Sequence, residues 1–345
     1  MIVDGLHKDL HTLSVGIAGL GLIGGSLARR FAKAGVRTVA WNHHPTPYAD
    51  ARAEGIECVD TVEELAAADL DILFLCTPLK AMDDVLARIA PVIGQRTTLS
   101  DVGSVKTQVH DAVVAAGLGK QYVGAHPMAG SEFSGFQASS ADLLDGALWA
   151  LTFDDTTDYF RYLLMARTIT ETLGNTFIGI DNATHDRAAA LISHMPHVVA
   201  TVLANTLTES PECNVAVALS AGSWRDMTRV ALTDPDRTRA MIEENPANVA
   251  ELTREVAQRL NEVADMLDDP HAHSFELADF FALADPYRRY KQAQRENAPI
   301  SEGTLSVYSM SWRRELCESA ERGERITHVD AIRTFSIAWR EISDM

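Results

Sequence analysis

The chain has 345 residues, of which 46% are hydrophobic, so it is long enough for two domains of ordinary globular composition. Its formal net charge of −18 argues against nucleic acid and membrane surfaces as partners, because both are anionic. The four cysteines form no CxxC and no metal-ligand spacing, which indicates reduced thiols. We find no signal-peptide core and no apolar run expected to span a bilayer, and therefore predict a cytoplasmic protein.

The first half of the chain alternates short apolar runs with helical patterns. Strands are predicted at residues 13–18, 38–41, 71–76, 97–101, 122–125, 147–153 and 176–180. Helices are predicted between them at residues 22–34, 62–68, 81–89, 105–116 and 158–173. This alternation predicts an α/β domain over residues 1–180, with a Rossmann-type, doubly wound and mainly parallel sheet.

From residue 181 the pattern becomes helical and no convincing strand follows. Helices are predicted at residues 184–209, 214–229, 236–244, 246–267 and 274–294, and an amphipathic tail helix at 326–342. We therefore predict an all-α domain over residues 181–345, tail included. Stretches such as 188–207 are apolar on more than one face, so they need cover from another element or chain. We expect a homodimer formed through this domain.

A glycine-rich turn follows the first predicted strand. Gly19, Gly21 and Gly24 form a GxGxxG motif between a predicted strand and a predicted helix. This position favours a dinucleotide-binding loop over the alternative, a glycine-rich turn without a ligand. The first glycine allows the tight turn, the second lets the pyrophosphate approach, and the third lets helix and strand pack. The backbone of Leu22 and Ile23 at the helix start would bind phosphate.

The second predicted strand ends in Asn42, His43 and His44 rather than in an acid. NAD-binding proteins usually have a carboxylate here for the ribose 2′-hydroxyl, and it would repel the 2′-phosphate of NADP. We therefore predict NADP, with NAD as the alternative. The two histidines also fit a solvated loop.

Two polar motifs follow later strands, at the sheet edge where ligands bind in doubly wound folds. Ser104 lies between a predicted strand and a predicted helix, where it fits equally well as a helix N-cap. His126 ends the next strand and is followed by Pro127, and its imidazole suits proton transfer. A structural histidine is the alternative.

The helical half carries two further candidates. His194 and His197 are three residues apart and lie on one face of the predicted helix. No third ligand residue occurs at a spacing typical of metal sites, so we predict no metal site. His197 fits either an anion donor or a buried structural residue. Arg229 follows Arg225 and Asp226 by one turn, so it fits either a surface ion pair or a bidentate clamp on a carboxylate.

Taken together, five motifs resemble the prephenate/arogenate (cyclohexadienyl) dehydrogenase family over roughly residues 13–290. They are GLGLIGGSLA at 19–28, DVGSVK at 101–106, HPMAGSE at 126–132, SHMPH at 193–197 and RDMTR at 225–229. The resemblance implies NAD(P)-dependent oxidative decarboxylation of prephenate or arogenate in tyrosine biosynthesis. It also implies an active site in a cleft between a nucleotide-binding domain and a helical dimerisation domain.

The resemblance also implies residue roles. His126 would take the proton of the ring hydroxyl, and Ser104 would orient His126 and the nicotinamide. Arg229 would hold a substrate carboxylate, and His197 would contact the substrate side chain. The remaining predicted substrate contacts are Ser131 and Glu132. The predicted cofactor contacts are Gly19, Gly21, Leu22, Ile23, Gly24, Asn42, His43, Thr77, Pro78 and Ser104.

Two other functions fit this two-domain pattern. A β-hydroxyacid dehydrogenase would use a lysine of the helical domain as its acid/base, but residues 181–244 contain none. A non-catalytic NADP sensor would need no grouping of His126, Ser104 and Arg229. Turnover of a substrate separates these alternatives from the dehydrogenase.

Overall fold

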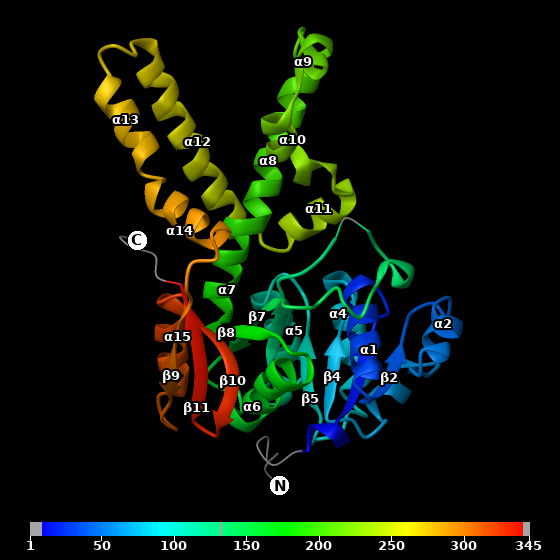
Figure 1. Ribbon diagram of the computed structural model, residues 1–345. Coiled ribbons are helices and arrows are strands. Elements are labelled where there is room, and N and C mark those ends of the chain that lie inside the picture. Colours follow the sequence, from blue (N-terminus) through cyan, green and yellow to red (C-terminus); the bar gives the residue numbers. More distant parts are fainter. Residues whose placement is uncertain (1–8, 132, 341–345) are drawn as a thin grey trace. The chain divides into compact units, whose positions relative to one another are not determined.

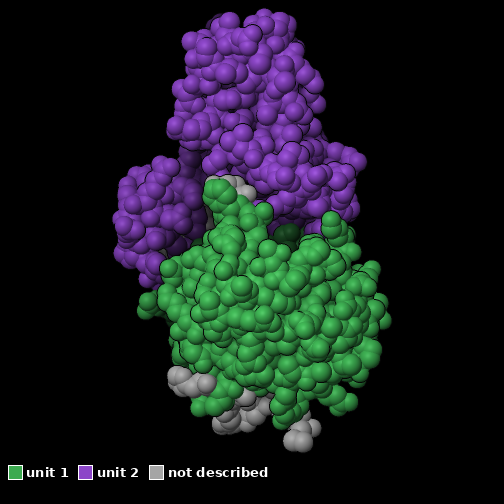
Figure 2. Space-filling model, turned by 90° about the vertical axis from the view of Figure 1, so that its right-hand side faces the viewer, with its two compact units in different colours: residues 1–185, 302–339 green, residues 186–301, 340–345 purple. Residues whose placement is uncertain are grey.

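The structure, a computed structural model, describes residues 9–131 and 133–340 (Figure 1). It has two compact units, and unit 1 comprises residues 1–185 and 302–339, whereas unit 2 comprises residues 186–301 and 340–345. Figure 2 shows unit 1 as one continuous body, although its residues come from two separate parts of the chain. The predicted extension of the helical domain to the C-terminus is therefore wrong for residues 302–339.

The first sheet of unit 1 is entirely parallel, with strand order β3-β2-β1-β4-β5. Its strands are β1 Ser14–Ala18, β2 Arg37–Trp41, β3 Glu57–Cys58, β4 Ile72–Leu75 and β5 Thr98–Asp101. The helices of this half are α1 Leu22–Lys33, α2 Tyr48–Ala53, α3 Val62–Ala66, α4 Met82–Ile89 and α5 Thr107–Ala115. The order reverses between β1 and β4, so a ligand crevice is expected at their carboxyl ends.

The second sheet of unit 1 is mixed, with order β6-β7-β8-β10-β11-β9. Its strands are β6 Gly124–Pro127, β7 Leu148–Phe153, β8 Thr176–Asp181, β9 Ser301–Ser306, β10 Arg325–Ala331 and β11 Thr334–Trp339. Strands β7 and β8 are parallel and are connected through α6 Tyr159–Arg167 and a π-helical turn, whereas β6 is antiparallel to β7 and β10 to β8. Leu99 and Tyr122 form an isolated parallel bridge from β5 to the start of β6. The prediction of a mainly parallel sheet thus describes the first sheet better than the second.

The C-terminal segment contradicts the predicted tail helix within its described residues. It forms β9, α15 Trp312–Glu321 and the antiparallel β10–β11 hairpin, and the hairpin lies beside β8 (Figure 1). The physical reason is visible in β11, where buried Phe335 and Ile337 alternate with partly buried residues, which is the period of a strand. Both side chains join the main core of unit 1, together with Trp312.

Unit 2 is helical in its described residues. Its helices are the end of α7 Asn182–Ala189, then α8 Met195–Glu209, α9 Cys213–Leu219, α10 Gly222–Thr228, α11 Pro235–Glu243, α12 Pro246–Asp268, α13 Ser274–Ala282 and α14 Asp285–Arg295. The start of α12 after Asn245 is as predicted, but the single helix predicted over 274–294 is divided before Asp285, where Pro286 disfavours continuation.

Much apolar surface of unit 2 is exposed. Its buried core cluster consists of Ala190, Val249 and Leu252. Large exposed apolar side chains include Leu191, Ile192, Val202, Val215, Leu219, Leu260, Phe275, Phe281 and Leu283. Residues 182–209 form one continuous helix that is long and apolar enough, by length and composition alone, to cross a membrane, contrary to our expectation of no such run. A helix that covers a subunit interface has the same composition.

Candidate functional site

The glycine loop after β1 leaves no room for a side chain at two of its three glycines. Gly19 has a φ of +112°, and a Cβ there would lie 2.8 Å from the carbonyl oxygen of Cys76. A Cβ on Gly24 would lie 2.0 Å from the carbonyl oxygen of Gly19, so helix and loop pack too closely for any side chain. Nothing lies within 4 Å of a Cβ built on Gly21, which leaves open space where the loop faces outward.

The residues around this loop fit a dinucleotide. Helix α1 begins after Gly21 without a side-chain cap, so the N–H groups of its first turn, including those of Leu22 and Ile23, lack intrahelical acceptors and can bind phosphate. Across the switch between β1 and β4, Thr77 precedes Pro78 and has a buried hydroxyl without a hydrogen-bond partner among the described residues. A buried hydroxyl without a protein partner at this edge fits a polar group of a ligand.

The end of β2 is uncharged and holds the glycine loop in place. The side-chain Oδ1 of Asn42 accepts a hydrogen bond from the N–H of Leu20 at 2.8 Å, and its Nδ2 donates to the carbonyl of His44 at 2.8 Å. His43 and His44 are exposed, and their rings meet edge to face. Asn42 therefore positions the loop as well as lining the region predicted for the ribose.

A buried polar network joins the end of β5 to β6. Lys106 and Asp101 are both fully buried and form an ion pair. The Nζ of Lys106 also donates to the carbonyl of Ala125 at 2.9 Å, and Tyr122 donates to the other oxygen of Asp101 at 2.7 Å. Since Ala125 precedes His126, this network fixes the loop after β5 relative to the backbone that carries His126.

Ser104 is not the helix cap that one of its two interpretations predicted. Helix α5 begins at Thr107, its N-cap position is Lys106, and no side chain caps it. Ser104 instead lies, partly buried, in the loop that leaves β5 at its carboxyl end. Within the described residues, no hydrogen bond joins Ser104 to His126. The loop position agrees with a ligand contact, which stays a prediction.

His126 lies on β6 and contacts a second histidine. Its ring Nδ1 is 2.9 Å from the Nε2 of His185, and the two rings meet edge to face with centroids 5.2 Å apart. His185, on α7, is only 3% exposed, whereas His126 is partly buried. The imidazole of His126 is therefore held by a buried partner at the carboxyl end of β6.

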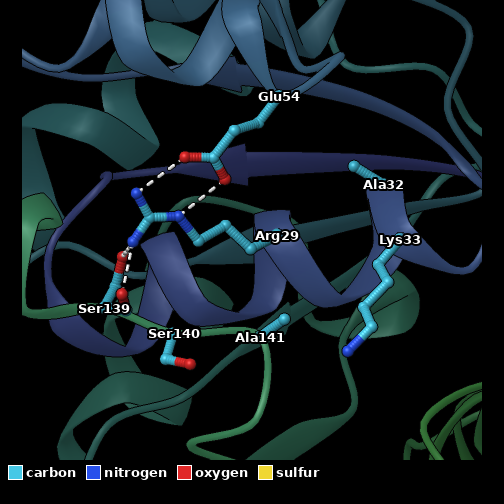
Figure 3. A pocket seen from close by; sticks show the side chains of 7 residues that line it. All are labelled: Arg29, Ala32, Lys33, Glu54, Ser139, Ser140 and Ala141. Atoms are coloured by element: carbon cyan, nitrogen blue, oxygen red, sulfur yellow. Dashed lines mark hydrogen bonds and ion pairs between the residues drawn. The ribbon is translucent and has the colours of Figure 1, made fainter.

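The loop that follows His126 is fastened to α1 at its far end (Figure 3). The guanidinium of Arg29 binds both oxygens of Glu54, at 2.8 and 2.9 Å, and the Oγ of Ser139 at 2.6 Å, and it stacks on the ring of Phe136. Arg29, Glu54 and Ser139 border a surface pocket of about 410 Å³. Because the charge of Arg29 is already paired, we interpret this pocket as an anchor for the loop and not as a ligand site.

The start of that loop carries two predicted substrate contacts. The Oγ of Ser131 accepts a hydrogen bond from the N–H of Phe133 at 3.3 Å, and Ser131 is partly buried. Glu132 lies outside the described residues. The roles of both residues stay predictions.

Unit 2 carries the remaining candidates. The Nδ1 of partly buried His197 donates to the carbonyl of Ser193 at 2.9 Å. His194 is instead buried against Asn245, so the two histidines have different environments. Arg229 is exposed and makes no ion pair or hydrogen bond with any described residue, whereas Arg225 lies 3.6 Å from Asp226. The predicted surface pair therefore involves Arg225, and the guanidinium of Arg229 is available to an anion.

Sequence reasoning missed His185, Lys106 and Asp101 as parts of the site. His185 is 59 residues from His126, and no local spacing links them. Lys106 and Asp101 both belong to the DVGSVK motif. The lysine follows the strand-end aspartate by five residues, and this spacing could have suggested an ion pair between them. Their complete burial could not be predicted from the local pattern.

Comparison with known proteins identifies the family. The nucleotide-binding domain of prephenate dehydrogenase matches residues 27–178, and its dimerization domain matches residues 181–282. The chain is 31% identical to the cyclohexadienyl dehydrogenase of Zymomonas mobilis over 67% of this chain and 80% of that protein.

Solved structures agree with this match. Prephenate dehydrogenase from A. aeolicus, solved with hydroxyphenyl propionate and NAD+, is 27% identical with a TM-score of 0.74, covering 82% of this chain and 99% of that one. A putative prephenate dehydrogenase from Corynebacterium glutamicum is 31% identical with a TM-score of 0.76, and the match covers 92% of this chain and 99% of that one. The chain therefore belongs to the prephenate/arogenate dehydrogenase family, and it is an NAD(P)-dependent enzyme that oxidatively decarboxylates prephenate or arogenate in tyrosine biosynthesis.

Proposed function

We propose that NADP+ is the preferred cofactor. The proposal rests on the end of β2, where Asn42 takes the place of a carboxylate and His43 and His44 follow on the surface. A carboxylate there would repel the 2′-phosphate, whereas an amide does not, and protonated histidines would attract it. We further propose that Gly21, the first turn of α1, and Thr77 with Pro78 hold the pyrophosphate and the neighbouring part of the cofactor.

We expect Asn42→Asp to shift the ratio of kcat/KM toward NAD+ by roughly tenfold or more, because a charge about 4 Å from the phosphate contributes ~1–4 kcal/mol near a protein surface. The aspartate can still accept from the N–H of Leu20, which holds the glycine loop, but it loses the hydrogen bond that Asn42 donates to the carbonyl of His44. The measurement is kcat/KM for each cofactor at saturating substrate.

Asn42→Ala serves as the companion variant. It loses the hydrogen bonds with Leu20 and His44 but adds no charge, so it should weaken the binding of both cofactors alike. An unchanged NADP+/NAD+ ratio in Asn42→Asp would show that this position does not select the cofactor.

We propose that His126 takes the proton of the substrate's ring hydroxyl. The observation that carries this assignment is its place at the carboxyl end of β6, where Lys106 ties its strand to the loop bearing Ser104. Bound NAD(P)+ supplies the acceptor for the hydride that leaves the ring, and loss of carbon dioxide makes the ring aromatic. His126 accepts the released proton, and Ser104 and Ser131 orient the reacting groups.

In unit 2, we propose that Arg229 binds a substrate carboxylate and that His197 contacts the substrate side chain. The protein has a net charge of −18, so an anionic substrate requires a local cation, and the guanidinium of Arg229 has no partner among the described residues. Its planar donors match a carboxylate in bidentate geometry.

We expect Arg229→Ala to raise KM for the substrate roughly 10- to 100-fold, as the loss of a charge-assisted hydrogen bond would, with kcat less affected. Steady-state kinetics at saturating cofactor measure this. Arg225→Ala is the matched control, because Arg225 is a neighbouring, exposed arginine paired with Asp226. If both variants keep the wild-type KM, Arg229 is a surface residue.

The choice between prephenate and arogenate turns on one group, since arogenate has an ammonium where prephenate has a keto oxygen. A nearby carboxylate would favour arogenate. Asp181 already accepts two hydrogen bonds from Thr184 at the start of α7, and Asp186 is only 5% exposed. Glu132, the third candidate, lies outside the described residues. Turnover measured with each compound shows whether the enzyme prefers prephenate or arogenate.

We propose that the enzyme is a cytoplasmic homodimer. The exposed apolar side chains of α8, α9 and α13 require cover, and residues 181–282 match a dimerization domain. A second copy of the chain provides this cover and also accounts for the apolar helix over residues 182–209.

A further inference from the structure

His185 stands out as a buried histidine in contact with the histidine that we assign to proton transfer. The Nε2 of His185 lies 2.9 Å from the Nδ1 of His126, and His185 is 3% exposed. We propose that His185 is a positioning residue, which sets the tautomer and the orientation of the His126 ring. This inference rests on the proposed role of His126.

The chemistry of the contact explains why the partner matters. A hydrogen bond between two imidazole nitrogens needs a hydrogen on one and a lone pair on the other. For His126 to accept a proton on Nε2, its neutral ring must carry its hydrogen on Nδ1 and donate it to His185. His185 must then be neutral, with its own hydrogen on Nδ1 and a lone pair on Nε2.

The same contact serves both protonation states of His126. After Nε2 has taken the substrate proton, the imidazolium still donates from Nδ1 to the lone pair of His185. No proton moves to His185, so its part resembles that of the group that orients a general-base histidine in hydrolases. The opposite arrangement, in which His185 donates, would leave neutral His126 with a hydrogen on Nε2 and no place for the incoming proton.

The surroundings of His185 suit a fixed acceptor. It lies in the first turns of α7, and the start of this helix is held by Asp181, which accepts from the N–H of Thr184 at 2.9 Å and from its hydroxyl at 2.6 Å. Because His185 is nearly fully buried, its side of the contact with His126 is shielded from water. A rigid, dry acceptor holds one tautomer of His126 more firmly than solvent would.

The test compares three substitutions of His185. In Gln, an amide oxygen can reach the position of the imidazole Nε2, whereas Asn is too short and Leu has no acceptor. We expect His185→Leu and His185→Asn to lower kcat by roughly 10- to 100-fold, the range for losing the partner that orients a functional histidine, with little change in KM. His185→Gln should restore most of the rate.

A direct readout does not depend on activity. The ¹⁵N shifts of the His126 ring should report the Nδ1–H tautomer in the wild type and in His185→Gln, and a mixture of tautomers in His185→Leu. Binding of NADP+ and the unfolding midpoint verify that each variant is folded. An unaltered His126 tautomer in folded His185→Leu would overturn the proposal.

A double-variant comparison separates this inference from the assignment of His126. If His185 acts through His126, then His185→Leu should cause no further loss of rate in a His126→Asn background. Equal losses in both backgrounds would show that His185 acts independently and would overturn the proposal alone. Full turnover in His126→Asn itself would overturn both.

Discussion

Replacing His126 by Asn is expected to lower kcat by roughly 10²- to 10⁴-fold, the usual contribution of a general base. The amide keeps a polar group at the carboxyl end of β6 but cannot take up a proton near neutral pH. Substrate and cofactor contacts on other residues are untouched, so KM values should stay close to wild type. Initial rates of cofactor reduction, with both ligands varied, measure the effect.

His328→Asn is a matched control for this prediction. His328 is an exposed histidine on β10, and the substitution there makes the same chemical change away from the candidate site. Wild-type kcat is expected for the control. If the two variants have equal kcat, His126 is a structural histidine and the proton is taken elsewhere.

The second large effect concerns stability. Lys106→Met should lower the free energy of unfolding of unit 1 by roughly 3–5 kcal/mol, because it leaves the fully buried Asp101 without its cation. The donors that remain to Asp101 are the Tyr122 hydroxyl and the N–H groups of Gly103 and Ala125, and none of them supplies a positive charge. Urea unfolding followed by tryptophan fluorescence measures the change, because four of the five tryptophans, Trp41, Trp149, Trp312 and Trp339, belong to unit 1.

Two further variants test the cause of this loss. Lys120→Met replaces an exposed lysine of the same unit and should leave the midpoint of unfolding nearly unchanged. The double variant Asp101→Asn/Lys106→Met removes both charges and should be more stable than Lys106→Met alone, since no uncompensated charge stays buried. If Lys106→Met unfolds at the same urea concentration as Lys120→Met, the ion pair contributes nothing to stability.

The sequence located the central elements of unit 1 because their signals are local. The strand predicted at 147–153 is β7 Leu148–Phe153, and the helix predicted at 22–34 is α1 Leu22–Lys33. The two-residue strand β3 is too short to produce a period. The C-terminal hairpin was mistaken for a helix because its burial is settled by distant partners, the core side chains near β8, and not by its own sequence.

The residues of the candidate site also fall into two groups, those that local sequence signals predict and those that they do not. The strand-end positions of Gly19 and His126 could be predicted because short apolar runs in the sequence mark β1 and β6. The partners that hold them could not. His185 reaches His126 only through the packing of α7, and Lys106 reaches Ala125 only because the chain between β5 and α5 turns inward.

The function assigned to this enzyme is tested most directly by the rate of cofactor reduction by the purified protein, with prephenate and arogenate each paired with NAD+ and NADP+. We predict turnover with at least one substrate, with a higher kcat/KM for NADP+ than for NAD+. Absence of turnover in all four combinations, from folded protein that binds NADP+, would contradict the assignment of the chemistry. Turnover with a clear preference for NAD+ would contradict the role given to Asn42.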